Sequence, residues 1–294
     1  MSLTCTLIQT KLFWEDAAAN RQMLEQKINS IQEKTEVVIL PEMFSTGFSM
    51  QPEKFAETMD GETVQWMKKI ASSKKIILTG SIMIRQAPSE RMSDGQSSDG
   101  GEHDAYFNRL IWMLPNGEFG VYDKRHLFAY GDEHNHYSGG NKRLIASVNG
   151  WKINLQVCYD LRFPVWARQS PPFFSQKEEG GWSLLEREEG LEYDVLIYVA
   201  NWPERRSVAW KTLLQARAIE NQCYVIGVNR VGEDGTGVYY TGDSMVINAM
   251  GEILYKKQHE EDVFTIQLNK QHLEETRKRF PFWKDADRFI ITNE

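Results

Sequence analysis

Short runs of strand length alternate with helical patterns along the first third of the chain. Residues 6–8, 37–40 and 76–78 are rich in Val, Ile and Leu, as are strands buried on both faces. Between them, residues 17–31 and 64–71 carry apolar side chains at helical spacing. This β-α-β-α-β order limits the fold more than any other feature, because it predicts an α/β fold in which helices cover a sheet.

The middle of the chain predicts hairpins instead. Strand-like residues 110–114 and 121 flank Pro-Asn-Gly-Glu at 115–118, and residues 144–148 and 153–157 flank Asn149-Gly150. Strand, helix and strand then return at residues 195–199, 210–214 and 225–228, followed by a hairpin over 244–256. We therefore expect sheets of mixed strand direction.

Composition favours one soluble domain over residues 1–294. The chain has 294 residues, of which 41% are hydrophobic and 26% charged, so a large core needs no disulfide or metal. Two stretches, at about residues 86–104 and 170–192, are rich in Ser, Gly, Asp or Glu and predict surface insertions, the first of them mobile. A formal charge of -7 and no basic stripe argue against a nucleic-acid partner.

The termini and cysteines indicate a cytoplasmic protein. The first residues contain no signal-peptide pattern, and no run of about 18 apolar residues predicts a membrane span. Cys5, Cys158 and Cys223 are far apart, which is typical of reduced thiols.

Polar residues follow several predicted strands at their carboxyl ends, where α/β folds bind ligands. Glu42 follows residues 37–40, Lys124 follows the return strand near 121, Cys158 follows 153–157 and Asn201 follows 195–200. We expect these side chains to converge on one site.

A thiol, a carboxylate and an ammonium would together form the catalytic groups of a hydrolase. Cys158 precedes what looks like a short helix, whose dipole and free N–H groups would favour a thiolate and hold an oxyanion. Glu42 could take the thiol proton, and Lys124 could stabilise negative charge. No metal or cofactor is required. Position alone leaves open that Cys158 is a buried structural cysteine.

The same residues resemble the nitrilase, or carbon–nitrogen hydrolase, superfamily, whose catalytic trio is Glu, Lys and Cys. The matching motifs are LPEMF at 40–44, YDKRHL at 122–127 and CYDLRFP at 158–164, in the family's order and spacing. The resemblance implies a four-layer αββα sandwich of two mixed β-sheets with outer helices. It also implies assembly into a homodimer or larger homo-oligomer.

The resemblance further implies a second glutamate between the lysine and the cysteine. Glu133 fits that place best, and Asp132 is the near alternative. Within the superfamily the chain is similar to omega-amidases, which release ammonia from 2-oxo acid amides such as 2-oxoglutaramate and serve methionine salvage. The segments carrying this similarity are DEH at 132–134, NWP at 201–203, ARAIEN at 216–221, VNRVG at 228–232, GDS at 242–244 and FPFWKDAD at 280–287.

The substrate's own carboxylate needs a positive partner, for which Arg206 and Arg162 are candidates. The other expected substrate contacts are listed together: Phe44, Tyr159, Asn201 and Trp202. For the aromatic residues among them, plain core packing is an equally good interpretation.

Other readings remain. A papain-like protease would need a histidine paired with Cys158, and a metal hydrolase could use the cluster of His126, Asp132, Glu133, His134 and His136. A non-catalytic binding or scaffold protein could share the fold. Within the superfamily, an N-carbamoyl amino acid hydrolase, an aliphatic amidase or a nitrilase would use the same trio.

Overall fold

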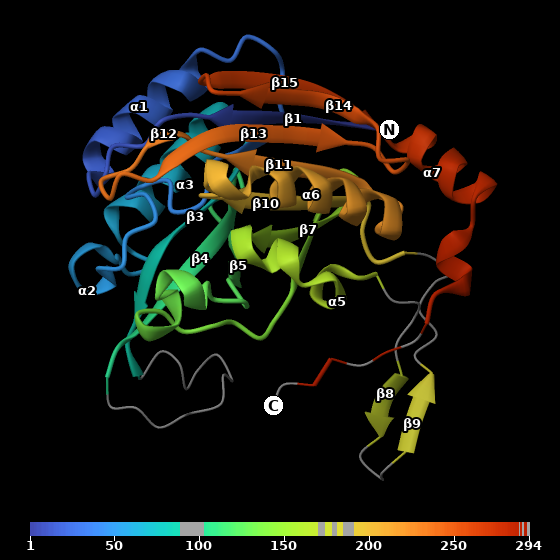
Figure 1. Cartoon of the computed structure of the whole chain (residues 1–294). Coiled ribbons are helices and arrows are strands. Elements are labelled where there is room, and N and C mark those ends of the chain that lie inside the picture. Colours follow the sequence, from blue (N-terminus) through green and yellow to red (C-terminus); the bar gives the residue numbers. More distant parts are fainter. Residues whose placement is uncertain are drawn as a thin grey trace.

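The computed structural model describes residues 1–88, 103–169, 174–177, 181–184, 191–287, 289 and 291–292. Two large sheets form its centre (Figure 1). The first sheet, in spatial order, consists of β15 (Asp262–Asn269), β1 (Ser2–Gln9), β2 (Val37–Ile39), β3 (Ile77–Gln86), β4 (Ala105–Met113) and β5 (Phe119–Asp123). The second consists of β12 (Val231–Glu233), β13 (Tyr239–Ile247), β11 (Tyr224–Asn229), β10 (Val195–Ala200), β7 (Trp151–Val157) and β6 (Leu144–Val148), with β14 (Ile253–Gln258) beside β13.

Both sheets mix strand directions, as the hairpin signals predict. Strands β1, β2 and β3 run parallel, whereas β15, β4 and β5 join antiparallel. In the second sheet β7, β10 and β11 run parallel, and β6 and β13 are antiparallel. The predicted hairpins are confirmed as β4–β5, β6–β7 and β13–β14.

Alternating side chains on β1 divide the interior into layers. Leu3, Cys5 and Leu7 pack in the core shared with the second sheet, whereas Ile8 packs beneath α1 (Ala17–Asn29) and α3 (Glu62–Lys74). On the other side, α6 (Ser207–Asn221) covers the second sheet (Figure 1). Its Trp210 is fully buried and belongs to the core. The order helices, sheet, sheet, helix is the predicted αββα sandwich.

The remaining elements are short or peripheral. They are α2 (Pro52–Phe55), α5 (Pro164–Ala167), α7 (Lys270–Arg279) and the 3₁₀ helices η1 (Ala129–Gly131), η2 (Glu133–Asn135), η3 (Cys158–Arg162), η4 (Glu204–Arg206) and η5 (Phe282–Asp285). No helix in the described ranges is long and apolar enough to cross a membrane.

Two boundaries differ from the sequence expectation. Helix α1 ends at Asn29, so Ile31 packs from the following loop. Strand β3 continues to Gln86, which is buried, so residue 86 belongs to the sheet and not to the insertion predicted at about 86–104. Residues 89–102 of that insertion lie outside the described residues. In the second stretch, β8 (Phe174–Lys177) and β9 (Gly181–Leu184) form an antiparallel hairpin outside the two sheets (Figure 1).

Candidate active site

Cys158 lies at the sharp turn between β7 and η3. Its φ of 45° is in the left-handed region, which a residue with a side chain rarely adopts and which marks a constrained position. The residue is 8% exposed, and its Sγ lies 4.0 Å from the carbonyl oxygen of Asn201. The turn thus presents the sulfur at the carboxyl ends of β7 and β10.

The surroundings of Cys158 favour the neutral thiol and not the thiolate that the sequence led us to expect. Burial raises the pKa of the Cys158 thiol, and the charge of Glu42 raises it further, against an opposing effect of Lys124. The following helix has only five residues, so its dipole is small beside these effects. The sulfur therefore holds its proton until a base removes it.

Glu42 is the base within reach. It is fully buried, and its charge adds to the effect of burial in raising the pKa of the Cys158 thiol. Its Oε2 accepts from the backbone N–H of Asn201 at 2.7 Å, and its carbonyl oxygen accepts from Asn201 Nδ2 at 2.7 Å. Asn201 therefore fixes Glu42 through both its backbone and its side chain.

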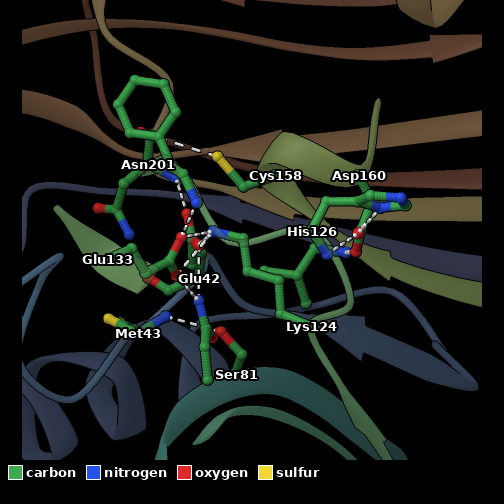
Figure 2. A network of polar contacts seen from close by, with 12 residues as sticks. Glu42, Met43, Ser81, Lys124, His126, Glu133, Cys158, Asp160 and Asn201 are labelled. Atoms are coloured by element: carbon green, nitrogen blue, oxygen red, sulfur yellow. Dashed lines mark hydrogen bonds and ion pairs between the residues drawn. The ribbon is translucent and has the colours of Figure 1, made fainter. Parts of the chain in front are cut away.

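Lys124 joins two carboxylates. Its Nζ donates to Glu42 Oε1 at 2.9 Å and to both oxygens of Glu133 at 2.9 Å, and all three side chains are fully buried (Figure 2). Burial alone would lower the pKa of Lys124, but the charges of Glu133 and Glu42 outweigh it and raise that pKa. Lys124 is therefore a permanent cation. We call Glu42, Lys124 and Glu133 the floor cluster.

The structure places Glu133, and not Asp132, beside Lys124. Glu133 Oε2 also accepts from the backbone N–H of Phe128 at 2.6 Å. Burial raises the pKa of Glu133, and Glu42 adds to the rise, while Lys124 opposes it. Asp132 faces solvent, where it bonds the side chains of Asn135 and His136.

Asp160 connects the nucleophile turn to the segment that carries Lys124. Its buried carboxylate accepts from the backbone N–H of Val157 at 3.0 Å and from the hydroxyl of Tyr122 at 2.7 Å. The other oxygen accepts from the backbone N–H of His126 at 3.0 Å and lies 2.8 Å from Nδ1 of that residue (Figure 2). One carboxylate thus holds both sides of the site in register.

A pocket of about 220 Å³ opens above Cys158 and Lys124. Its volume suits a small molecule better than a polypeptide segment. The residues lining it are Phe48, Met50, Lys124, Phe128, Gly131, Cys158, Tyr159, Arg162, Asn201, Trp202, Pro203, Arg205, Arg206, Asp234, Thr236, Val238 and Tyr240. Tyr159, Asn201, Trp202 and Arg206 are thus where the sequence reasoning expected them.

Three arginines surround the pocket, and we call Arg162, Arg205 and Arg206 the mouth arginines. Within the described ranges none of them has an ion pair with a carboxylate. Arg162 lies over the Trp202 ring at 5.1 Å, and Arg206 over the Phe128 ring at 4.8 Å. Burial and the charges of its arginine neighbours lower the pKa of Arg206, so positive charge here is uncompensated.

One expected pocket residue is misplaced. Phe44 is fully buried in the core beneath α3, with its ring 6.0 Å from that of Trp66, and it does not line the pocket. The chain turns at Met43, whose φ is 43° and whose N–H donates to Ser81 Oγ at 2.9 Å. This turn directs Glu42 inward and Phe44 to the opposite face of the sheet.

The sequence reasoning also missed two polar residues. Asp160 and Asn108 are both fully buried, and Asn108 bonds Glu42 directly. Asp160 stands within the motif at 158–164, so its type and position were visible but its partners were not. Asn108 lies in an apolar strand with no motif residue beside it, and only its polarity at a buried position could have indicated it.

The alternative ligand sets do not form in the part of the chain that the structure describes. There, no group of three His, Cys, Asp or Glu side chains is arranged to hold a metal ion. Of the suggested cluster, Glu133 faces Lys124 and His126 faces Asp160. His126, which a papain-like scheme could use as its base, has its Nδ1 2.8 Å from the Asp160 carboxylate.

Known proteins share this arrangement of the chain. A family model described as carbon-nitrogen hydrolase matches residues 4–170 and 189–278. The chain is 40% identical over 290 residues to the omega-amidase YafV of Escherichia coli (strain K12), covering 98% of both proteins. It is 28% identical over 287 residues to the 2-oxoglutaramate amidase of Bacillus subtilis (strain 168), covering 97% of this chain and 98% of that protein.

A solved structure agrees. XC1258 from Xanthomonas campestris, a CN-hydrolase superfamily protein with an arsenic adduct in its active site, superposes with a TM-score of 0.85 at 40% identity, covering 99% of this chain and 100% of that one. Nit3 of Saccharomyces cerevisiae, a nitrilase superfamily member, shares the fold with a TM-score of 0.75 at 23% identity over 95% of this chain and 94% of that one. With the matched residues covering most of its length, the chain belongs to the carbon–nitrogen hydrolase family, and it is a hydrolase of carbon–nitrogen bonds.

Proposed function

We propose that this protein is an omega-amidase, which hydrolyses the terminal amide of a small 2-oxo acid such as 2-oxoglutaramate to the acid and ammonia. The observation that carries the proposal is the fully buried floor cluster beside Cys158, at the base of a small pocket ringed by unpaired arginines. The similarity to the omega-amidase YafV supports the choice of substrate.

The first half of the proposed reaction forms a thioester. Glu42 takes the proton of Cys158 as the sulfur attacks the amide carbon, so that the C–S bond forms and the carbonyl oxygen becomes an oxyanion. Lys124 Nζ stabilises this charge together with the backbone N–H of Tyr159, which lies in the first turn of η3 and has no acceptor there. The C–N bond then breaks as Glu42 returns the proton to nitrogen, and ammonia leaves.

The second half releases the acid. Glu42 removes a proton from water, whose oxygen attacks the thioester carbon through a second oxyanion. The C–S bond breaks, and the proton held by Glu42 returns to the sulfur. Glu133 never needs to move a proton in this scheme, since it accepts from Lys124 with both oxygens and keeps the ammonium in place.

The substrate's carboxylate would meet the mouth arginines. Arg206 is the principal candidate because it lines the pocket, is partly buried and is fixed over the Phe128 ring. An anion placed there would relieve the repulsion among the three guanidinium groups. The small pocket would leave a chain of only a few carbons between that carboxylate and Cys158.

The decisive test is ammonia release from 2-oxoglutaramate, beside glutamine, an N-carbamoyl amino acid and a simple nitrile. The proposal expects turnover of the 2-oxo acid amide to exceed that of the other three. Preference for one of the others would reject the substrate while keeping the thioester chemistry. No turnover of any of them, with the Cys158 thiol intact, would reject the function itself.

We further propose that residues 1–294 act as one domain in a cytoplasmic homo-oligomer, with a place in methionine salvage. The long family match supports a single domain, and three cysteines without a disulfide support a cytoplasmic location. Exposed apolar residues on α5 and α6, such as Val165, Val208 and Ile219, support self-association. Light scattering on the purified chain would give the oligomer size, and a monomer would reject that part.

A further inference from the structure

Asn108 occupies a place beside the floor cluster that the proposed mechanism does not use. It lies in β4 on the face shared with Leu110 and Trp112, which belong to the core between the two sheets. Its backbone oxygen accepts from the backbone N–H of Lys124 at 3.0 Å, and its side chain and the Lys124 ammonium both donate to Glu42 Oε1. The side chain is fully buried.

The Asn108 amide donates to both carboxylates of the floor cluster. Its Nδ2 lies 2.7 Å from Glu42 Oε1 and 3.4 Å from Glu133 Oε1. Ionised carboxylates only accept hydrogen bonds, so the nitrogen must face them and the oxygen must face away. The network therefore fixes the orientation of this amide, and its Oδ1 is left with no partner in the described part of the structure.

This arrangement gives the two oxygens of Glu42 separate surroundings. Oε1 receives both the Lys124 ammonium and the Asn108 amide, whereas Oε2 receives the backbone N–H of Asn201. A carboxylate held at both oxygens cannot rotate freely.

We propose that Asn108 is a positioning residue: by donating from one amide to Glu42 and Glu133, it holds the Glu42 carboxylate in the orientation needed to exchange a proton with Cys158. The proposal rests on the proposed thioester chemistry. Asn108 touches neither the sulfur nor the pocket, so it acts through Glu42.

Serving both carboxylates from this position requires a neutral side chain that donates hydrogen bonds. An apolar residue would remove one donor from each carboxylate and leave Lys124 to satisfy both. An aspartate would place a third carboxylate against two buried ones, which favours binding of a proton by the group as a whole. The two substitutions therefore predict different defects.

The test compares Asn108→Ala and Asn108→Asp with wild type across pH, using two readouts. For the amide that wild type hydrolyses, we expect Asn108→Ala to lower kcat roughly 100-fold with KM changed less than about threefold. We expect Asn108→Asp to move the acid limb of kcat/KM to higher pH by about one unit, because the added carboxylate makes protonation of the group easier. A residue that only filled space would not separate kcat from KM in the way expected of Asn108→Ala.

The second readout, alkylation of Cys158 by iodoacetamide, needs no substrate. Both variants should change the pH dependence of alkylation, whereas Asn116→Asp in the exposed turn after β4 should leave it unchanged. An Asn108→Ala enzyme with wild-type kcat and alkylation would overturn the proposal. So would an Asn108→Asp profile superposing on wild type in a variant that remains folded by thermal melting. If wild type turns over no amide, the proposed function fails, while the alkylation profiles still decide the role of Asn108.

Discussion

The floor and the mouth of the pocket both carry positive charge, but they compensate it differently. At the floor, Lys124 is fully buried and bonds two carboxylates at 2.9 Å. At the mouth, Arg162 and Arg206 lie over aromatic rings, and none of the three arginines has a carboxylate ion pair among the described residues. One pocket is therefore lined both by a paired cation, Lys124, and by arginines without a carboxylate partner.

The difference teaches which charges belong to the enzyme and which await a ligand. A fully buried charge must be paired inside the protein, because its desolvation is otherwise too costly. A partly hydrated arginine can remain unpaired until an anion arrives. Changes at the floor should therefore alter turnover and stability, and changes at the mouth should alter substrate affinity alone.

Removing the nucleophile should produce the largest effect. We expect Cys158→Ala to lower kcat on the order of 10⁴-fold or more, because the thioester can no longer form. The melting temperature should stay near that of wild type, since the substitution removes one sulfur at the edge of the pocket. Cys223→Ala, a change at another buried thiol, should keep its activity. Substantial turnover by Cys158→Ala would remove the distinction between a reactive floor and a binding mouth.

Removing the floor cation should affect both turnover and folding. Lys124→Met leaves Glu42 and Glu133 buried without their shared partner, so we expect a loss of about 3–5 kcal/mol in the free energy of unfolding. Urea unfolding measures this change, and kcat should fall in parallel. Lys69→Met on the exposed face of α3 is the matched control and should change stability little. Equal effects of the two substitutions would contradict the pairing argument.

Neutralising Glu42 should lower the pH at which the Cys158 thiol becomes reactive. The charge of Glu42 raises the pKa of Cys158, so Glu42→Gln removes a cause of the rise and lowers that pKa. A lower pKa means more thiolate at a given pH, so alkylation by iodoacetamide should begin at lower pH in the variant. Turnover should nevertheless fall, because no base remains to handle protons. A variant profile displaced to higher pH would show that the thiol is governed by something other than Glu42.

Neutralising the mouth should have a smaller effect and a different signature. We expect Arg206→Gln to raise KM for the anionic amide about 10-fold with kcat nearly unchanged, because one charge-assisted contact is lost. KM for a neutral amide of the same length should change little. The more exposed Arg205 is the control, and its replacement by Gln should raise KM less. A variant in which both amides suffer equally would place Arg206 in general pocket shape.

The sequence predicted the floor better than the mouth for a physical reason. Glu42, Lys124 and Cys158 each follow a recognisable strand, the first two in one sheet and Cys158 in the other, and ligands bind at the carboxyl ends of such strands. Apolar runs of strand length and Asn-Gly turns likewise predicted the strands and hairpins of the two sheets. The number of mouth arginines and the roles of Asn108 and Asp160 depend on which side chains meet across elements, and local pattern carries no such information.

Backbone geometry limited the prediction at single positions. The alternation of strand residues would carry Phe44 to the same side as Glu42, but the left-handed turn at Met43 reverses it. The φ of Met43 is 43°, a conformation that methionine rarely adopts, so the residue type could not predict this turn. Cys158 likewise has a left-handed backbone conformation that its residue type does not indicate, and this conformation sets the direction of the sulfur.

Phe44 supplies the smallest expected effect and marks where the floor ends and the core begins. Its ring fills space against Trp66 beneath α3, so Phe44→Leu should cost about 1–2 kcal/mol of unfolding free energy by leaving a small cavity. Because the ring is absent from the pocket lining, kcat and KM should stay near wild type. Phe48 does line the pocket, with its ring 5.2 Å from Lys124 Nζ, so Phe48→Leu should change kcat or KM with less loss of stability. If the two variants exchanged these behaviours, the turn at Met43 would not separate the site from the core.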